Sequence, residues 1–121
     1  MTGRNLTDFI DSWLASWTGN QPDKLIGYYS TDAYYQDPAR PTGLRGDAAI
    51  LGYFRKLLAV NPAWRWRRVE VIPTEKGCCL KWEASIPTKG DDIHFTGLDI
   101  VEMEGDKITR NEVYFDASVL K

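Results

Sequence analysis

In the first half of the chain, apolar residues recur every three or four positions in three segments, which is the spacing of an amphipathic helix. The first segment lies between a candidate N-cap at Asn5 and the pair Gly19-Asn20, which ends it. The second begins at Pro22, a residue suited to the first helical position, and the third runs from about Asp47 to Val60. The apolar positions of the three segments are Leu6, Phe9, Ile10, Trp13, Leu14 and Trp17; Leu25, Ile26 and Tyr29; and Ile50, Phe54, Leu57 and Leu58.

The pattern between and after these helices is that of strands and turns. An extended stretch from Ala33 to Asp37 ends at Pro38, because the residue before a proline avoids helical backbone angles. The stretch from Pro38 to Gly46 holds two prolines and two glycines and is predicted to be a loop. After Pro62 apolar and polar residues alternate, which predicts four strands. The residues that share a face in each strand are Trp64, Trp66 and Arg68; Cys78, Leu80, Trp82, Ala84 and Ile86; Ile93, Phe95, Gly97, Asp99, Val101 and Met103; and Asn111, Val113 and Phe115.

Three helices followed by a four-stranded antiparallel meander predict an α+β fold. We expect residues 1–121 to form one cone-shaped domain, in which the three N-terminal helices pack against a strongly curved antiparallel sheet that encloses a pocket. Both faces of the third strand are rather apolar, since Phe95 and Val101 lie on one face and Leu98 and Ile100 on the other. The outer face is therefore expected to form a homodimer interface, unless a loop or the C-terminal tail covers it.

Composition and charge exclude several kinds of partner. The chain has 43% hydrophobic residues, with five tryptophans and six tyrosines, which suits a wide aromatic-lined interior. The formal net charge of −2 gives no overall positive field for nucleic acid or an anionic membrane. The segment Trp64-Arg65-Trp66-Arg67-Arg68 resembles a base-stacking surface, but alternation places its tryptophans and the two intervening arginines on opposite faces. No apolar run approaches the roughly 18 residues needed to span a bilayer. We therefore expect a soluble protein.

The sequence predicts neither a metal site nor a bound cofactor. His94 is the only histidine, is expected to point outward, and belongs to no cluster of histidine and cysteine. No set of serine, histidine and aspartate suits nucleophilic catalysis, and no glycine-rich loop suits phosphate. Cys78 and Cys79 are adjacent and would point to opposite faces of a strand, so a disulfide between them is not expected. Their presence as free thiols favours a reducing, cytoplasmic setting.

Two aspartates are the candidate chemical groups. Alternation places Asp99 in the middle of a strand, on the same face as Phe95 and Val101. An ionised carboxylate in such an apolar interior must be paired, hydrogen-bonded or protonated; the alternatives are a salt bridge to an arginine or a break in register that turns Asp99 outward. Asp37 precedes Pro38, where an aspartate is commonly a turn residue that accepts backbone hydrogen bonds, so its interest comes from being paired with Asp99.

The run Tyr34-Tyr35-Gln36-Asp37-Pro38 and the helix start Gly43-Leu44-Arg45-Gly46-Asp47-Ala48-Ala49-Ile50 resemble the nuclear transport factor two-like superfamily, in its SnoaL-like and ketosteroid isomerase-like branch. The resemblance covers nearly the whole chain. It implies that Asp37 occupies the place of the general base in ketosteroid isomerases. It also implies that Asp99 matches the protonated aspartate that stabilises the oxyanion, an arrangement that is a known example of a carboxylic acid kept neutral by an apolar site.

This sequence departs from the ketosteroid isomerase pattern at Trp13, which stands where that family has a tyrosine. An indole N–H donates a hydrogen bond but is a much weaker acid than a phenol, so enolisation or aldol chemistry of a smaller ketone is favoured over steroid isomerisation. SnoaL-type polyketide cyclases use one aspartate as acid and base for an aldol closure, a role that Asp99 could fill. Limonene epoxide hydrolases use an Asp-Arg-Asp group, whereas Gly97 and Val113 stand here at the second and third positions.

The leading hypothesis is a cofactor-independent isomerase or aldol-type cyclase acting next to a carbonyl group of a small apolar substrate. Asp37 would remove a proton, and Asp99, neutral through burial, would stabilise the enolate with help from Trp13 or Asn111. The alternative is a non-catalytic module, either a small-molecule binder or a dimeric scaffold, and an epoxide hydrolase is the third choice. The pocket is expected to be lined by Trp13, Tyr29, Tyr35, Tyr53, Phe54, Trp82, Ala84, Ile86, Phe95, Val101, Asn111, Val113 and Phe115.

Overall fold

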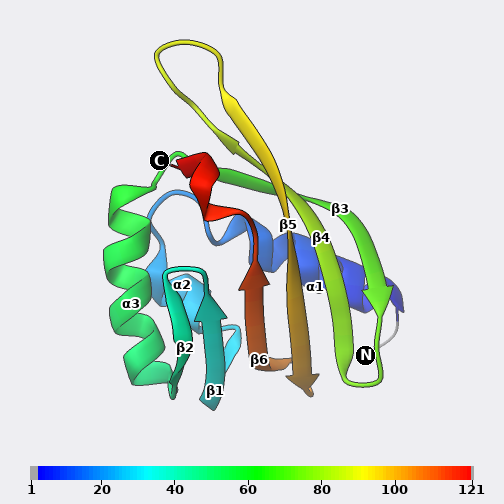
Figure 1. The fold of residues 1–121 in the computed structure, drawn as a ribbon. Coiled ribbons are helices and arrows are strands. Elements are labelled where there is room, and N and C mark those ends of the chain that lie inside the picture. The colour runs from blue at the N-terminus through cyan, green and yellow to red at the C-terminus, as the bar shows by residue number, and fades with distance from the viewer. Residues whose placement is uncertain (1–2, 121) are drawn as a thin grey trace.

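A computed structural model of the chain describes residues 3–120 and has the predicted α+β architecture (Figure 1). Helices and strands follow the order expected from the sequence, with one additional strand and a short C-terminal 3-10 helix. The helices are α1 (Gly3–Ala15), α2 (Pro22–Ile26), α3 (Asp47–Val60) and η1 (Ala117–Leu120). The strands are β1 (Tyr29–Asp37), β2 (Arg40–Arg45), β3 (Arg65–Pro73), β4 (Gly77–Ile86), β5 (Ile93–Glu104) and β6 (Lys107–Tyr114).

All six strands belong to one open sheet in the order β2-β1-β6-β5-β4-β3. The predicted meander from β3 to β6 is antiparallel throughout, with Leu80 opposite Asp99 and Val113 on the other side of Asp99. The sheet as a whole is mixed, because β1 joins it parallel to β6. The expected antiparallel arrangement therefore holds for every pair except this one, which brings residues far apart in sequence side by side.

Two local predictions need correction. The segment between Pro38 and Gly46 is not simply a loop, because β2 forms a hairpin with β1 in which Tyr35 pairs with Leu44. A proline has no N–H group to donate to a strand ladder, so within a sheet it is found mainly in edge strands. Pro41 lies in β2, which is at the edge of this sheet. Tyr29 is the first residue of β1 and not part of α2, although its side chain is buried as expected.

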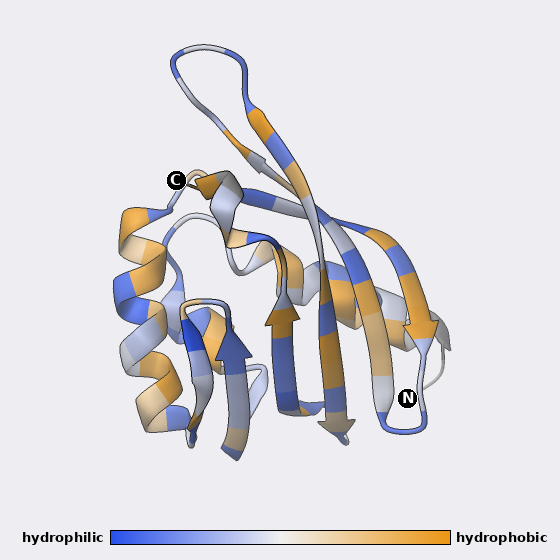
Figure 2. Ribbon diagram, viewed as in Figure 1, coloured by the Kyte–Doolittle hydropathy of each residue, from blue (hydrophilic) through white to orange (hydrophobic). Residues whose placement is uncertain are grey.

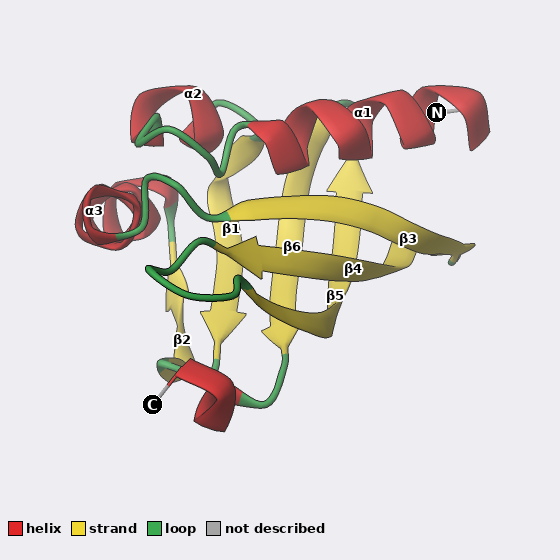
Figure 3. Ribbon diagram, turned by 90° about the horizontal axis from the view of Figure 1, so that it is seen from above, coloured by secondary structure: helices red, strands yellow, loops and turns green. Residues whose placement is uncertain are grey.

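The helices cover the sheet on one side and at one end. Viewed from above, α1 and α2 lie along one side, α3 lies beside β1 and β2, and η1 lies on the side away from α1 (Figure 3). Along β3 and β5, hydrophobic residues alternate with hydrophilic ones, so each strand has one face suited to the core (Figure 2). The largest fully buried side chains include Trp13, Tyr35, Phe54, Ile10, Leu25, Ile50, Leu58 and Leu80. No helix in the described part of the chain is long and apolar enough to cross a membrane.

Candidate functional site

A cavity of about 210 Å³ lies between α1, α3, the C-terminal segment and the inner face of the sheet. Its lining is almost entirely apolar and aromatic, and it includes all five tryptophans of the chain. Pockets for drug-sized ligands typically have volumes of about 300–1,000 Å³, so this cavity suits a smaller molecule. The lining residues are Trp13, Leu14, Trp17, Tyr35, Asp37, Pro38, Ala39, Tyr53, Leu57, Leu58, Asn61, Trp64, Trp66, Trp82, Phe95, Asp99, Val113, Phe115, Ala117 and Leu120.

Asp99 lies in the middle of β5 and is only 4% exposed. Its two carboxylate oxygens accept hydrogen bonds from neighbouring strands: Oδ1 from the indole Nε1 of Trp82 at 2.7 Å, and Oδ2 from the amide Nδ2 of Asn111 at 2.8 Å. A carboxylate offers about four acceptor positions, so these two donors from the described residues leave about two for a ligand. Asp99 therefore borders the cavity as a carboxyl group that is held in place but can still accept protons.

The position of Trp82 depends on Gly97, which lies directly opposite it in the register of β4 and β5. A Cβ atom at Gly97 would stand 2.3 Å from Cζ2 of the Trp82 ring, well inside van der Waals contact. The absence of a side chain thus lets the indole lie across β5 and direct its N–H at Asp99, two residues further along the strand. The place that would hold an arginine in the epoxide hydrolase pattern is filled here by the Trp82 ring.

Burial raises the pKa of Asp99 to about 7. Removing the carboxylate from water disfavours the charged form, and the negative charge of Asp37 adds to the effect. The hydrogen bonds from Asn111 and Trp82 act in the opposite direction, because they stabilise the ionised form, but they do not cancel the effect of burial. Asp99 therefore changes protonation state close to neutral pH.

A buried chain of hydrogen bonds runs from α1 through the sheet to Asp99. Nε1 of Trp13 donates to the Tyr29 hydroxyl at 3.2 Å, and that hydroxyl donates to Oδ1 of Asn111 at 2.8 Å. Accepting this bond orients the Asn111 amide so that its NH₂ group faces Asp99. Burial holds the pKa of Tyr29 well above its usual value, so its hydroxyl remains a donor. The N–H groups of Trp13 and Asn111 thus both donate hydrogen bonds within the protein, and Asn111 connects the chain to Asp99.

Asp37 lies at the turn between β1 and β2 and accepts four hydrogen bonds. Oδ1 accepts from the backbone N–H groups of Ala39 at 2.9 Å and Arg40 at 3.0 Å, as in a turn stabilised by its own aspartate. Oδ2 accepts from the hydroxyls of Tyr35 at 2.8 Å and Tyr53 at 2.6 Å. Four donors occupy about all the acceptor positions of a carboxylate, so Asp37 is fully hydrogen-bonded where it meets the cavity.

Comparison with known proteins places this fold in a family. A family profile described as SnoaL-like domain matches residues 10–111. The chain belongs to the SnoaL-like domain family. This confirms the predicted resemblance to the nuclear transport factor two-like superfamily. No curated protein matches this SnoaL-like domain in sequence.

Solved structures share the fold of this SnoaL-like domain at low sequence identity. One is a hypothetical protein of Catenulispora acidiphila with a ketosteroid isomerase-like fold, in complex with trimethylamine. Its TM-score is 0.80 at 19% sequence identity, and the match covers 93% of this chain and 88% of that protein's chain. TerC, co-crystallised with polyporic acid, has a TM-score of 0.76 at 16% identity over 95% and 94% of the two chains. An uncharacterised cystatin-fold protein of Novosphingobium aromaticivorans has a TM-score of 0.69 at 14% identity over 91% and 97%.

The structure brings most of the predicted site residues of the SnoaL-like domain together. Both aspartates line the cavity, as do Trp13, Tyr35, Tyr53, Trp82, Phe95, Val113 and Phe115. The remaining predicted residues are absent from its lining. Tyr29 and Asn111 lie behind it in the hydrogen-bonded chain, and the others are Phe54, Ala84, Ile86 and Val101.

The lining residues that the sequence did not predict come mainly from α1, α3 and the segments that follow them, from the β1–β2 turn, and from the chain before β3 and after β6. Trp64 and Trp66 line the cavity. The alternation of their segment predicts that both side chains lie on the same face of a strand, so the sequence does carry a signal for them. Leu57 lies four residues after Tyr53 on α3, which puts the two side chains on the same helical face. Ala117 and Leu120 follow the last strand, and no periodic pattern marked them. The other missed lining residues are Leu14, Trp17, Pro38, Ala39, Leu58 and Asn61.

Among residues 3–120, no group of three or more histidine, cysteine, aspartate or glutamate side chains is placed to hold a metal ion. His94 is exposed on β5, on the face of the sheet away from Asp99. The chemistry that the site offers thus resides in its two carboxyl groups and the hydroxyl and N–H groups around them.

Proposed function

We propose that this SnoaL-like domain is a cofactor-independent acid/base enzyme, an isomerase or aldol-type cyclase, acting next to a carbonyl group of a small apolar substrate. One observation carries the proposal: the Asp99 carboxyl group borders an aromatic cavity, is held by two donors, and keeps about two acceptor positions for a ligand. Its pKa of about 7 supports the same role, because a general base works best when its pKa lies near the working pH.

In this reaction the ionised Asp99 accepts the proton from the carbon next to the carbonyl group. The C–H electron pair forms the carbon–carbon double bond of an enolate, and the carbonyl π electrons move to oxygen. Asp99, now protonated, returns the proton at another carbon in an isomerase, or to the new alkoxide after a carbon–carbon bond forms in a cyclase. General acid–base catalysis of this kind typically contributes about 10²–10⁴ in rate.

We assign proton transfer to Asp99 and a positioning role to Asp37, whereas the family pattern suggested Asp37 as the base. Each oxygen of Asp37 already accepts two hydrogen bonds, so it can take a proton only after a donor moves away. The candidate donor is Tyr53, which is partly exposed and lines the cavity, whereas Tyr35 is fully buried. Asp37 is better suited to fixing these two hydroxyls at the cavity wall.

The comparisons support a small organic ligand in this cavity. Two structures that share the fold have small molecules in their descriptions, trimethylamine in one and polyporic acid in the other. The aromatic lining fits an apolar molecule, and the volume of about 210 Å³ favours one smaller than a typical drug.

The experiment that tests the proposal measures exchange of the α-protons of 2-tetralone in D₂O by ¹H NMR. We expect the wild-type protein to accelerate exchange, with a rate that rises as pH passes about 7 and Asp99 ionises. Asp99→Asn should abolish the acceleration, and Asp92→Asn, which removes an exposed carboxylate in the β4–β5 turn, should leave it unchanged. Acceleration that survives in Asp99→Asn but is lost in Asp37→Asn would return the base to Asp37. No acceleration by the wild type with this ketone or with a panel of cyclic enones would favour a non-catalytic binding module.

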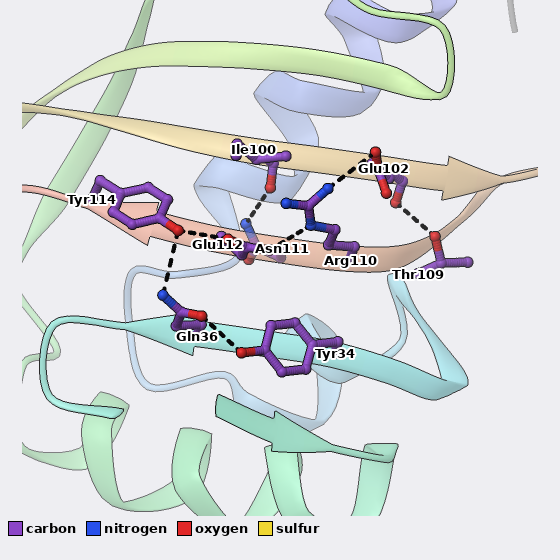
Figure 4. A network of polar contacts seen from close by, with 9 residues as sticks. All are labelled: Tyr34, Gln36, Ile100, Glu102, Thr109, Arg110, Asn111, Glu112 and Tyr114. Atoms are coloured by element: carbon purple, nitrogen blue, oxygen red, sulfur yellow. Dashed lines mark hydrogen bonds and ion pairs between the residues drawn. The ribbon is translucent and has the colours of Figure 1, made fainter. Parts of the chain in front are cut away.

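We also propose that two chains form a homodimer through the outer face of the sheet. Leu98 and Tyr114, which pair across β5 and β6, are 49% and 46% exposed on this face. A continuous polar network borders them: the Tyr34 hydroxyl donates to Gln36, Gln36 donates to Tyr114, and the Tyr114 hydroxyl donates to Glu112 (Figure 4). Such a mixture of apolar side chains with fixed polar groups is typical of interfaces between subunits.

The two cysteines support a reducing compartment. Both are free thiols, and burial raises the pKa of the Cys78 thiol to about 11, so the reactive thiolate form is disfavoured at neutral pH. Free thiols persist where the cell keeps proteins reduced. We therefore propose a cytoplasmic location.

A further inference from the structure

The cavity combines negative charge with the absence of any basic side chain in its lining. Asp37 and Asp99 are its only charged residues, and no lysine, arginine or histidine occurs among the described residues that line it. The arginine that comes close is Arg40, which stacks on the Tyr53 ring at 5.1 Å but is exposed to solvent and absent from the lining. An anionic ligand would therefore meet two carboxyl groups with no cation in the lining to balance them, which disfavours anions as occupants of the cavity.

The walls of the cavity are aromatic where they approach Asp99. Trp82 donates its N–H to that carboxylate, and the rings of Phe95 and Phe115 pack edge-on against Trp82, with centroids 5.8 Å away in both cases. On the helix side, the Trp17 ring lies 6.0 Å from that of Trp66. The faces of aromatic rings carry partial negative charge and attract cations, and a desolvated cation–π contact contributes about 2 kcal/mol.

We propose that this cavity binds a compact alkylammonium ion, a secondary or tertiary amine in its protonated form, with its N–H group donating to Asp99 and its alkyl groups against the tryptophan rings. The acceptor positions that Trp82 and Asn111 leave free on Asp99 provide the hydrogen bond. The inference rests on the cavity of the proposed function and on Asp99, but it does not require proton transfer to carbon.

The charge of an ammonium ion would also balance the charge of Asp99. An ionised carboxylate that is 4% exposed is costly, and the site has no internal cation to pair with it. A bound ammonium ion supplies that partner, so it is favoured over a neutral molecule of the same shape whenever Asp99 is ionised.

Binding should therefore follow the ionisation of Asp99. The titratable groups that act on Asp99 are Asp37 and Tyr29 from β1 and Cys78 from β4. The pKa values of Tyr29 and Cys78 are raised by burial, so both stay neutral at and below pH 8. With an Asp99 pKa of about 7, about one carboxyl group in a hundred is ionised at pH 5 and most are ionised at pH 8.

The test compares two probes with the same number of heavy atoms, N-methylpyrrolidine, which is protonated between pH 5 and pH 8, and neutral cyclopentanone. Binding is followed by tryptophan fluorescence, since all five tryptophans line the cavity, and by calorimetry. We expect N-methylpyrrolidinium to bind about a hundredfold more weakly at pH 5 than at pH 8, as the ionised fraction of Asp99 falls. Cyclopentanone should not gain affinity as pH rises over that range.

Variants complete the test. Asp99→Asn should abolish the pH dependence and weaken N-methylpyrrolidinium binding at pH 8, while Asp92→Asn should bind like the wild type; circular dichroism verifies that each variant is folded. The inference is overturned if cyclopentanone binds as tightly as N-methylpyrrolidinium at pH 8, or if ammonium binding does not change with pH in the wild type. Ammonium binding without ketone exchange would refute only the proposed reaction, and exchange without ammonium binding would refute only this inference.

Discussion

Replacing Asp99 by asparagine should make the stability of the protein less sensitive to pH. The folded protein holds the Asp99 proton with a pKa of about 7, whereas an unfolded chain releases it near 3.8. Between these values the folded state binds more protons than the unfolded state, so folding stability falls as pH rises through this window. The fall is complete once pH exceeds the folded pKa, and a difference of about 3 pH units corresponds to about 4 kcal/mol.

Asparagine keeps the size of the side chain but cannot ionise. It offers a single acceptor oxygen, so either Trp82 or Asn111 loses its partner, at a cost of about 1–3 kcal/mol at every pH. Relative to the wild type, Asp99→Asn should therefore be less stable at pH 4 and should gain about 4 kcal/mol by pH 8. The change with pH, and not the offset, reports on Asp99.

The assay is urea unfolding of wild type and variant at pH 4, 5, 6, 7 and 8, followed by circular dichroism. Titration of the other carboxyl groups occurs in both proteins and cancels in the difference. Asp92→Asn, at an exposed position, should show a difference from the wild type that does not vary with pH. If the Asp99→Asn difference is equally constant, the carboxyl group is not destabilised by burial, and both its assignment as a base at neutral pH and the ammonium inference lose their physical basis.

Three further changes test other parts of the argument. Trp82→Phe removes a hydrogen bond that stabilises ionised Asp99, so the proton affinity of Asp99 should rise about tenfold or more in a ¹³C-carboxyl NMR titration; an unchanged pKa would contradict the described contact. Gly97→Ala should lower the free energy of unfolding by about 1–3 kcal/mol, because the new Cβ would overlap Trp82. The control is Gly52→Ala on the exposed side of α3, where the new Cβ meets no other atom. This variant should raise the free energy of unfolding by about 0.5–1 kcal/mol. Leu98→Asp should convert a dimer to a monomer in light scattering, and a wild type that is already monomeric would refute the proposed interface.

The parts of the fold that sequence predicted well are those where one local pattern decides the outcome. The predicted third helix has the bounds of α3, Asp47–Val60, because its apolar stripe is regular and Asn61-Pro62 ends it. The alternation of β4 and β5 predicted which face carries Asp99, since a strand has only two faces. Neither result required knowledge of distant contacts.

The parts that sequence could not predict depend on pairing between distant segments. β2 carries a proline and a glycine and has no alternation of its own, and it becomes a strand because β1 offers it an edge. The parallel pairing of β1 with β6 joins residues about eighty positions apart, such as Tyr35 and Asn111. No periodicity within either strand encodes that choice.

The same distinction separates the surroundings of the two buried aspartates. Burial of Asp99 followed from its strand, but its donors, Trp82 and Asn111, are diagonal neighbours on β4 and β6 that only the register brings within reach. Asp37 has two donors from its own turn and one from two residues before it, and α3 adds Tyr53. A carboxylate with four donors is fixed as an acceptor, whereas one with two donors in an apolar cavity keeps both its proton affinity and room for a ligand. The smaller number of hydrogen bonds at Asp99, together with the burial that raises its pKa, is therefore what favours Asp99 over Asp37 as the proposed base.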